Sequence, residues 1–140
     1  TRFYFSYIYL NMNTLFTAII LTPIVEYTIH LGLHLIKNKT HKNHHTEVHT
    51  NNNRIERLPL IIAYICLYMR YYIIGFGFLQ YWTIHSLIHF YPQYLPKYIV
   101  RHHLNHHKNP SVCFAICAPC IDVLFGTDST ILSINDKINM

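Results

Sequence analysis

Histidine is the residue type in this chain whose number and spacing could support chemistry, with twelve copies in 140 residues. Ten of the twelve follow one pattern used twice, a His-x-x-x-His pair and then a His-x-x-His-His trio. Two trios with matching pairs before them are far less expected by chance than one trio alone. The pattern predicts a functional site built from His30, His34, His41, His44 and His45 in the first copy and His85, His89, His103, His106 and His107 in the second.

The spacing within each copy suits metal ligation. Residues at positions i, i+3 and i+4 share one face of a helix, so their imidazoles can point at one centre. Two such half-sites could bind two metal ions, each with about five imidazoles or with some shared through a bridging oxygen species. Imidazole binds iron, copper, nickel and zinc, so the ligand type leaves the metal open. We interpret His49 and His102, outside the pattern, as solvent-facing or as hydrogen-bonding partners of the ligands.

The elements that must position these histidines are apolar stretches that end beside them. Residues 13–36 are long enough, as a helix, to cross a bilayer core, and they end at the first pair. Residues 58–90 end at the second pair. Because all ten ligands must meet on one side, we expect residues 58–90 to form a hairpin of two short helices that turns near residues 71–77. Gly75 and Gly77 suit a break or a close helix contact there. Each trio is expected on a short helix just outside the bilayer.

The composition favours a membrane protein. Hydrophobic residues make up 51% of the chain and charged residues 12%, against roughly 25% charged in a soluble domain. We expect an all-α fold, a small integral membrane helical protein in one domain over residues 1–140. The chain begins at Thr1 rather than at methionine, which is compatible with N-terminal truncation. Most basic residues lie in or beside the histidine-rich segments, which indicates the cytoplasmic side of a membrane rather than a nucleic-acid surface: Lys37, Lys39, Lys42, Arg54, Arg57, Lys97, Arg101 and Lys108.

The four cysteines are too few and too closely spaced for a disulfide scaffold. Cys117-x-x-Cys120 invites a zinc or redox interpretation, but a structural zinc site would need a second pair of ligands at suitable spacing. We therefore interpret the four cysteines as small packing residues of a protein in a reducing compartment.

Over roughly residues 26–127 the sequence resembles the fatty acid hydroxylase and sterol desaturase superfamily. The trio His41-Lys42-Asn43-His44-His45 follows the first pair closely, as in the smaller members and the related carotenoid ring hydroxylases. Leu31, Trp82, Ser86 and Phe114-Ala115 differ from the residues common at those positions, which leaves substrate choice open. The other motifs that carry the resemblance are Glu26-Tyr27-x-x-His30-x-x-x-His34, Tyr81-x-x-x-His85-x-x-x-His89-Phe90, Arg101-His102-His103-Leu104-Asn105-His106-His107 and Pro119-x-x-Asp122-x-x-Phe125-Gly126-Thr127.

The resemblance implies an O2-dependent, non-haem di-iron lipid hydroxylase, with the ten paired histidines as ligands of two iron ions. Zinc can replace iron in preparations. Electrons are expected from NAD(P)H through a separate, small electron-transfer protein. The expected location is an endoplasmic reticulum or bacterial inner membrane, with the site on the cytoplasmic face. A fatty acyl or sphingolipid chain is the expected substrate, and no nucleic acid is expected as a partner.

Other interpretations stay open. The same dimetal chemistry would serve a lipid or sterol desaturase, or a carotenoid ring hydroxylase, which the short gap from His34 to His41 favours and Phe125-Gly126-Thr127 disfavours. From a different class, the chain could be a non-catalytic membrane protein that stores or transports zinc or copper. Transport predicts ionisable residues along the spans, which offer little besides Glu26 and Arg70. An inactive remnant is the last alternative.

Overall fold

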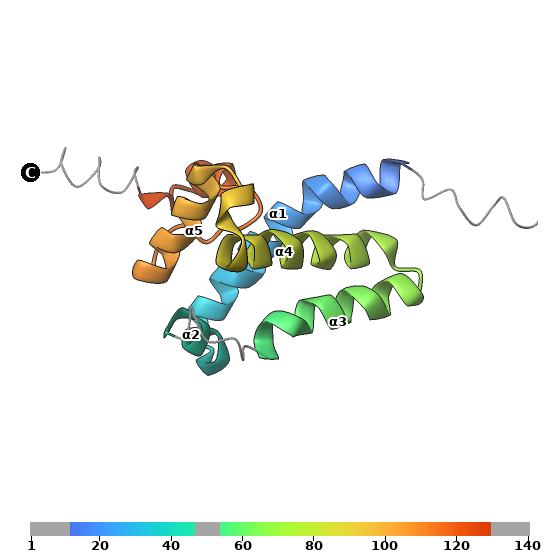
Figure 1. Ribbon diagram of the computed structural model, residues 1–140, viewed down its shortest axis with the longest axis horizontal. Helices are drawn as coiled ribbons and strands as arrows, with labels where there is room; N and C mark the ends of the chain where they lie inside the picture. The colour runs from blue at the N-terminus through green and yellow to red at the C-terminus, as the bar shows by residue number, and fades with distance from the viewer. Residues whose placement is uncertain (1–11, 47–53, 130–140) are drawn as a thin grey trace, which may run out of the picture.

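The computed structural model describes residues 12–46 and 54–129, and within these ranges the regular elements are all helical. This agrees with the expected all-α class. His49 lies outside the described residues. The elements, shown in Figure 1, are α1 (Met12–Leu35), α2 (Lys39–Thr46), α3 (Arg54–Tyr68), α4 (Tyr72–Phe90), the 3-10 helix η2 (Pro92–Tyr94), α5 (Lys97–Lys108) and α6 (Cys120–Phe125).

The turn from α1 to α2 places the first histidine pair beside the first trio. Lys37 adopts a left-handed backbone (φ 51°), and its amide donates to the carbonyl of His34, as at many helix C-termini. The Asn38 side chain then accepts the amide of His41 at 3.0 Å and caps the start of α2. So short a connection brings His41 back against His34.

The hairpin expected from residues 58–90 is present as α3 and α4, which pack along their lengths (Figure 1). Its turn lies at residues 69–71, which overlaps the expected range of 71–77 only at its first residue. Arg70 has a left-handed φ of 66° there. Gly75 and Gly77 lie inside α4 rather than in the turn, because both serve close helix contacts. A Cβ at Gly75 would come within 2.7 Å of the Leu67 side chain.

Helix α4 is the central helix, with α3 packed along one side and α1 crossing the other (Figure 1). Gly77 permits the crossing, since a Cβ there would lie 2.8 Å from the Thr22 hydroxyl oxygen of α1. Helices α2, α5 and α6 gather at the end of the molecule where α1 and α4 finish. A small apolar core of Tyr27, Phe114 and Ala115, with Leu31 and Ile121 against it, lies at this end.

Apolar side chains also cover the outside of the helices. Phe16 on α1 is 65% exposed and Tyr64 on α3 is 72% exposed, and many aliphatic side chains accompany them. By length and composition α1 could cross a membrane, and no other helix in the described ranges meets the same criteria. Contiguous exposed apolar surface is typical of a face that meets lipid or another protein.

Candidate metal centre

The ten paired histidines form two groups, and in each group the candidate ligand nitrogens all lie within 4.8 Å of one another. The first histidine group is His30, His34, His41, His45 and His106. The second histidine group is His44, His85, His89, His103 and His107. Each group could hold a metal ion. The structure therefore brings together every histidine that the repeated pattern singles out.

Each copy of the pattern contributes one ligand to the group that is formed mainly by the other copy. Neighbouring residues on a helix project about 100° apart, so the adjacent His44 and His45 of α2 cannot both face one centre. His45 joins the first group and His44 the second. On α5, His106 and His107 divide in the same way. Each group thus takes four ligands from one copy of the pattern and one from the other.

In the first histidine group, neighbouring Nε2 atoms lie at the separation expected of ligands around one ion. The distance is 2.9 Å from His41 to His34, 3.1 Å from His45 to His41 and 3.1 Å from His34 to His106. Two ligands at right angles on bonds of about 2.1 Å would be about 3.0 Å apart, whereas a tetrahedral arrangement would separate them by about 3.4 Å.

The second histidine group repeats this spacing. His89 Nε2 lies 3.1 Å from that of His85 and 3.1 Å from that of His103, and His107 Nε2 lies 2.9 Å from that of His103. The His44 ring completes the group, with its centroid 4.9 Å from those of both His85 and His107. The two groups therefore have the same ligand number and the same close packing of nitrogens.

Two backbone carbonyls determine which nitrogen can bind a cation. His30 Nδ1 donates to the carbonyl of Phe114 and His106 Nδ1 to that of Val112, each at 2.6 Å. A carbonyl only accepts, so Nδ1 carries the proton and Nε2 keeps its lone pair when each ring is neutral. The Nε2 of His30 is buried without a hydrogen-bond partner. A buried lone pair without a hydrogen-bond donor is one that a bound cation would satisfy, and the donor set therefore fits a metal ion.

The helices outside the apolar spans keep their histidines neutral. Burial, followed by the charges of neighbouring imidazoles, lowers the pKa of His41 to about 3 and that of His45 to about 4. Burial is also the main cause that lowers the pKa of His106 to about 3. Neutral imidazole is the form that ligates metals, so these side chains need no deprotonation at neutral pH.

The backbone between α5 and α6, which we call the 112–117 segment, carries the two orienting carbonyls and is held by two buried carboxyl groups. Glu26 of α1 accepts the amides of Ile116 and Cys117 at 2.7 and 3.2 Å. Asp122 of α6 accepts those of Phe114 and Ala115 at 2.8 and 2.6 Å. The carboxyl groups act through this segment and not at the ion.

The end of α6 holds Asp122 in place. Gly126 ends the helix in the left-handed conformation at φ 71°, which favours glycine. Thr127 then donates its hydroxyl to Asp122 at 2.6 Å, and it lies 3.2 Å from the hydroxyl of Tyr27. His102 donates Nε2–H to Asp122 at 2.9 Å. His102 is 7% exposed, so of its two expected roles the structure excludes the solvent-facing one.

Sequence reasoning missed the 112–117 segment, because its contribution comes from backbone carbonyls. The signal available was indirect: two acidic residues, Glu26 and Asp122, inside motifs otherwise built from apolar residues and histidine. Cys117 and Cys120 belong to none of the potential metal-binding groups in the described ranges, and both are free thiols.

Comparison of the chain with protein families, with curated proteins and with solved structures finds no match.

Proposed function

We propose that this protein is a membrane-bound di-iron oxygenase that hydroxylates a lipid with O2 and externally supplied electrons. The observation that carries the proposal is the pair of five-histidine groups, whose ligand nitrogens lie within 4.8 Å of one another in each group. Structural zinc sites use four ligands in a tetrahedron. Five imidazoles at near right-angle spacing instead favour a metal of higher coordination number with room for a small exogenous ligand.

Iron bound there would supply the activation of O2 and the cleavage of an unactivated C–H bond. One oxygen atom enters the substrate as a hydroxyl group and the other leaves as water, which consumes two electrons and two protons from a separate donor. The chain's own contribution is to hold ten neutral imidazoles in place. The carbonyls of Val112 and Phe114 orient His106 and His30, and the buried carboxyl groups of Glu26 and Asp122 hold the backbone that carries them by accepting its amides.

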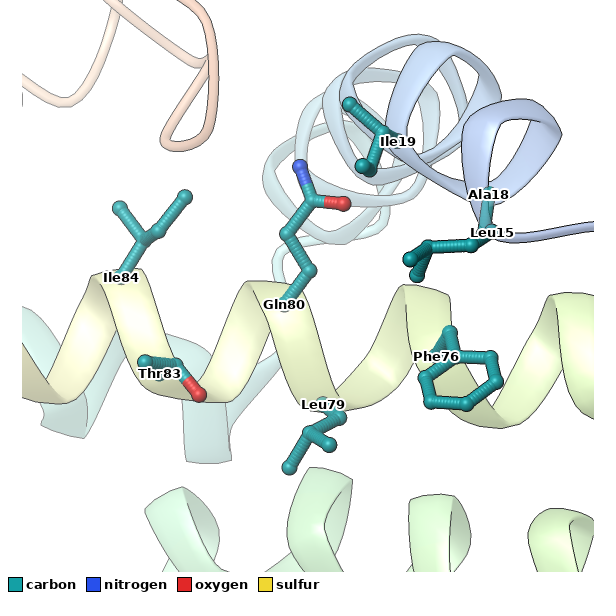
Figure 2. Close-up of a pocket in the computed structure, with 8 residues that line it drawn as sticks. All are labelled: Leu15, Ala18, Ile19, Phe76, Leu79, Gln80, Thr83 and Ile84. Atoms are coloured by element: carbon teal, nitrogen blue, oxygen red, sulfur yellow. The ribbon is translucent and has the colours of Figure 1, made fainter. Parts of the chain in front are cut away.

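The substrate side of the proposal rests on an apolar groove between α1 and α4. The groove encloses about 260 Å³, and its walls include Leu15, Ile19, Phe76 and Ile84. Figure 2 shows Leu15 and Ile19 on α1 across from Phe76 and Gln80 on α4. Both walls belong to helices that end in ligands, and Ile84 directly precedes His85. An aliphatic chain lying along this groove would therefore run between two helices toward the ends that carry the histidines.

The electron donor is proposed to be a small acidic protein that approaches the histidine-bearing end. Lys39 and Lys42 on α2 and Arg101 and Lys108 on α5 are exposed beside the two groups. Opposite charges steer protein association and raise its rate. The same basic residues suit the cytoplasmic side of a bilayer.

The test is product analysis in cells that express the full chain with a compatible electron donor. We expect a lipid heavier by one oxygen atom, labelled when the cells are supplied with isotopically labelled O2. His106→Ala should abolish the product because it removes a proposed metal ligand, whereas loss of a group that only orients a ligand costs roughly 10- to 100-fold. Gln93→Ala, at an exposed position on η2, is the matched control and should retain the product.

The remaining outcomes separate the other interpretations. A lipid lighter by two hydrogen atoms would assign a desaturase on the same site. Absence of any oxidised fatty acyl, sphingolipid, sterol or carotenoid product, from a metal-loaded protein with a working donor, would refute an oxygenase and favour metal storage or an inactive remnant.

A further inference from the structure

A third cluster of metal-binding side chains lies beside the ten histidines, and the proposed reaction does not use it. It consists of His102, Cys113 and Asp128, whose potential ligand atoms all lie within 4.8 Å of one another. The three residues are 7%, 0% and 8% exposed. Imidazole nitrogen, thiolate sulfur and carboxylate oxygen are all zinc ligands, and the sulfur distinguishes this cluster from the two histidine groups.

The two ring nitrogens of His102 have different surroundings. Nε2 lies 2.9 Å from Asp122 Oδ2, which is an ordinary hydrogen-bond length. Nδ1 lies 3.4 Å from Asp128 Oδ2, which is longer than such a bond. Two tetrahedral ligands on bonds of about 2.0 to 2.1 Å would be about 3.3 to 3.4 Å apart. The 3.4 Å separation is that of an ion pair when His102 is protonated, and it equals the spacing of two ligands around a tetrahedral ion.

The Asp122 contact prepares His102 for this role. A metal-bound imidazole commonly donates its other N–H to a carboxylate, which determines the tautomer and the orientation of the ring. Asp122 accepts from Nε2 here, so Nδ1 is the nitrogen that faces Asp128, and a metal ion would bind there in place of the Nδ1 proton. The pairing of carboxylate and imidazole is thus already in place.

The backbone of Cys113 supplies an independent observation. Its φ of 59° lies in the left-handed region, which residues other than glycine seldom adopt. Such a conformation persists only where the surroundings impose it, and it is concentrated at functional sites. The amide of Cys113 donates to the carbonyl of Thr127 at 2.8 Å, so this conformation joins the 112–117 segment to the end of α6.

We propose that His102, Cys113 and Asp128 bind a third divalent cation, with zinc preferred and a water molecule as the fourth ligand, at a site separate from the two histidine groups. The ion would anchor the 112–117 segment at Cys113, between the carbonyls of Val112 and Phe114 that orient His106 and His30. The proposal shares no ligand with the histidine groups, so it stands or falls independently of the oxygenase.

Cobalt(II) substitution of the full chain in detergent tests the site, because only a sulfur ligand gives thiolate-to-cobalt charge transfer in the near ultraviolet. We expect wild-type protein to develop this band with one equivalent of bound cobalt. Cys113→Ser should abolish the band and lower total bound cobalt from three equivalents to two. Cys120→Ser is the matched control, since Cys120 is exposed and outside the cluster, and it should retain the band.

The wild-type spectrum decides the question even if Cys113→Ser does not fold. Cobalt-loaded wild-type protein without a charge-transfer band would overturn the proposal and leave the cluster as hydrogen-bonded side chains. A band that persists in Cys113→Ser would overturn it as well. A second variant, Asp128→Asn, should weaken cobalt binding at this site by about tenfold or more, and unchanged affinity would exclude Asp128 as a ligand.

Discussion

Replacement of Asp122 by asparagine tests whether the buried carboxylate holds the metal centre together. Asp122 is fully buried and accepts four hydrogen bonds, from the amides of Phe114 and Ala115, the hydroxyl of Thr127 and Nε2 of His102. An asparagine carbonyl can accept two of these, and the amide group beside it donates instead of accepting. Two donors therefore lose their acceptor in Asp122→Asn.

The expected loss of stability follows from those two hydrogen bonds. A bond to a charged group contributes about 1.5 to 3 kcal/mol, so Asp122→Asn should lower the free energy of unfolding by about 3 to 6 kcal/mol. For a chain of this size that corresponds to a fall in Tm of roughly 10 to 20 °C. The shifted 112–117 segment should also weaken metal binding, by about 10- to 100-fold.

Thermal unfolding of metal-free protein in detergent, followed by the fluorescence of the single tryptophan, Trp82, measures the stability change, and metal titration measures the affinity. Glu26→Gln is the matched control. The glutamine carbonyl can keep both amide bonds that Glu26 Oε1 accepts, while its amide replaces Oε2, which has no hydrogen-bond partner. Its cost should stay below that of Asp122→Asn, at about 1 to 3 kcal/mol, since both amide bonds are kept and only one amide group is left without a partner. An Asp122→Asn protein with unchanged Tm and metal affinity would refute the positioning role.

Four further predictions follow from the site and the helix packing. Metal analysis of iron-loaded Cys113→Ser should give two ions per chain, and a stoichiometry of one or below would count against two histidine-bound ions. Burial lowers the pKa of His41 to about 3 and the pKa values of His44 and His45 to about 4. Because these histidines in the unfolded chain bind protons below about pH 6.5, the metal-free protein should lose stability as the pH falls from about 6.5 to about 4. A Tm that rises on acidification would contradict this. Gly77→Ala should lower the free energy of unfolding by about 1 to 3 kcal/mol, because the new Cβ would lie 2.8 Å from the Thr22 hydroxyl oxygen. In the same denaturant titration, the control Gly32→Ala should be neutral or stabilising, because there is open space around its Cβ. In membranes, Lys42→Cys and Lys108→Cys should both react with an impermeant thiol reagent from the same side, and labelling from opposite sides would break the proposed topology.

The amino-acid sequence by itself determined the helices and the identity of the histidines that come together. Apolar runs and the spacing His-x-x-x-His are local features, and a helix responds to them within one or two turns. The hairpin of α3 and α4 was predicted from a different argument, because histidines on both sides of residues 58–90 have to meet on one side of the membrane. Its turn was placed only approximately, because Gly75 and Gly77 carry the same sequence signal whether they end a helix or permit a close contact inside one.

Only the tertiary structure decided which histidines share a group. His44 and His45 are adjacent in sequence and project about 100° apart, so their assignment depends on how α2 packs against α1, α4 and α5. The same holds for His106 and His107, and for this reason each copy of the pattern contributes one ligand to the other group. The roles of the Val112 and Phe114 carbonyls could not be predicted from the sequence either. Every residue has a carbonyl, and only packing selects the two that face His106 and His30.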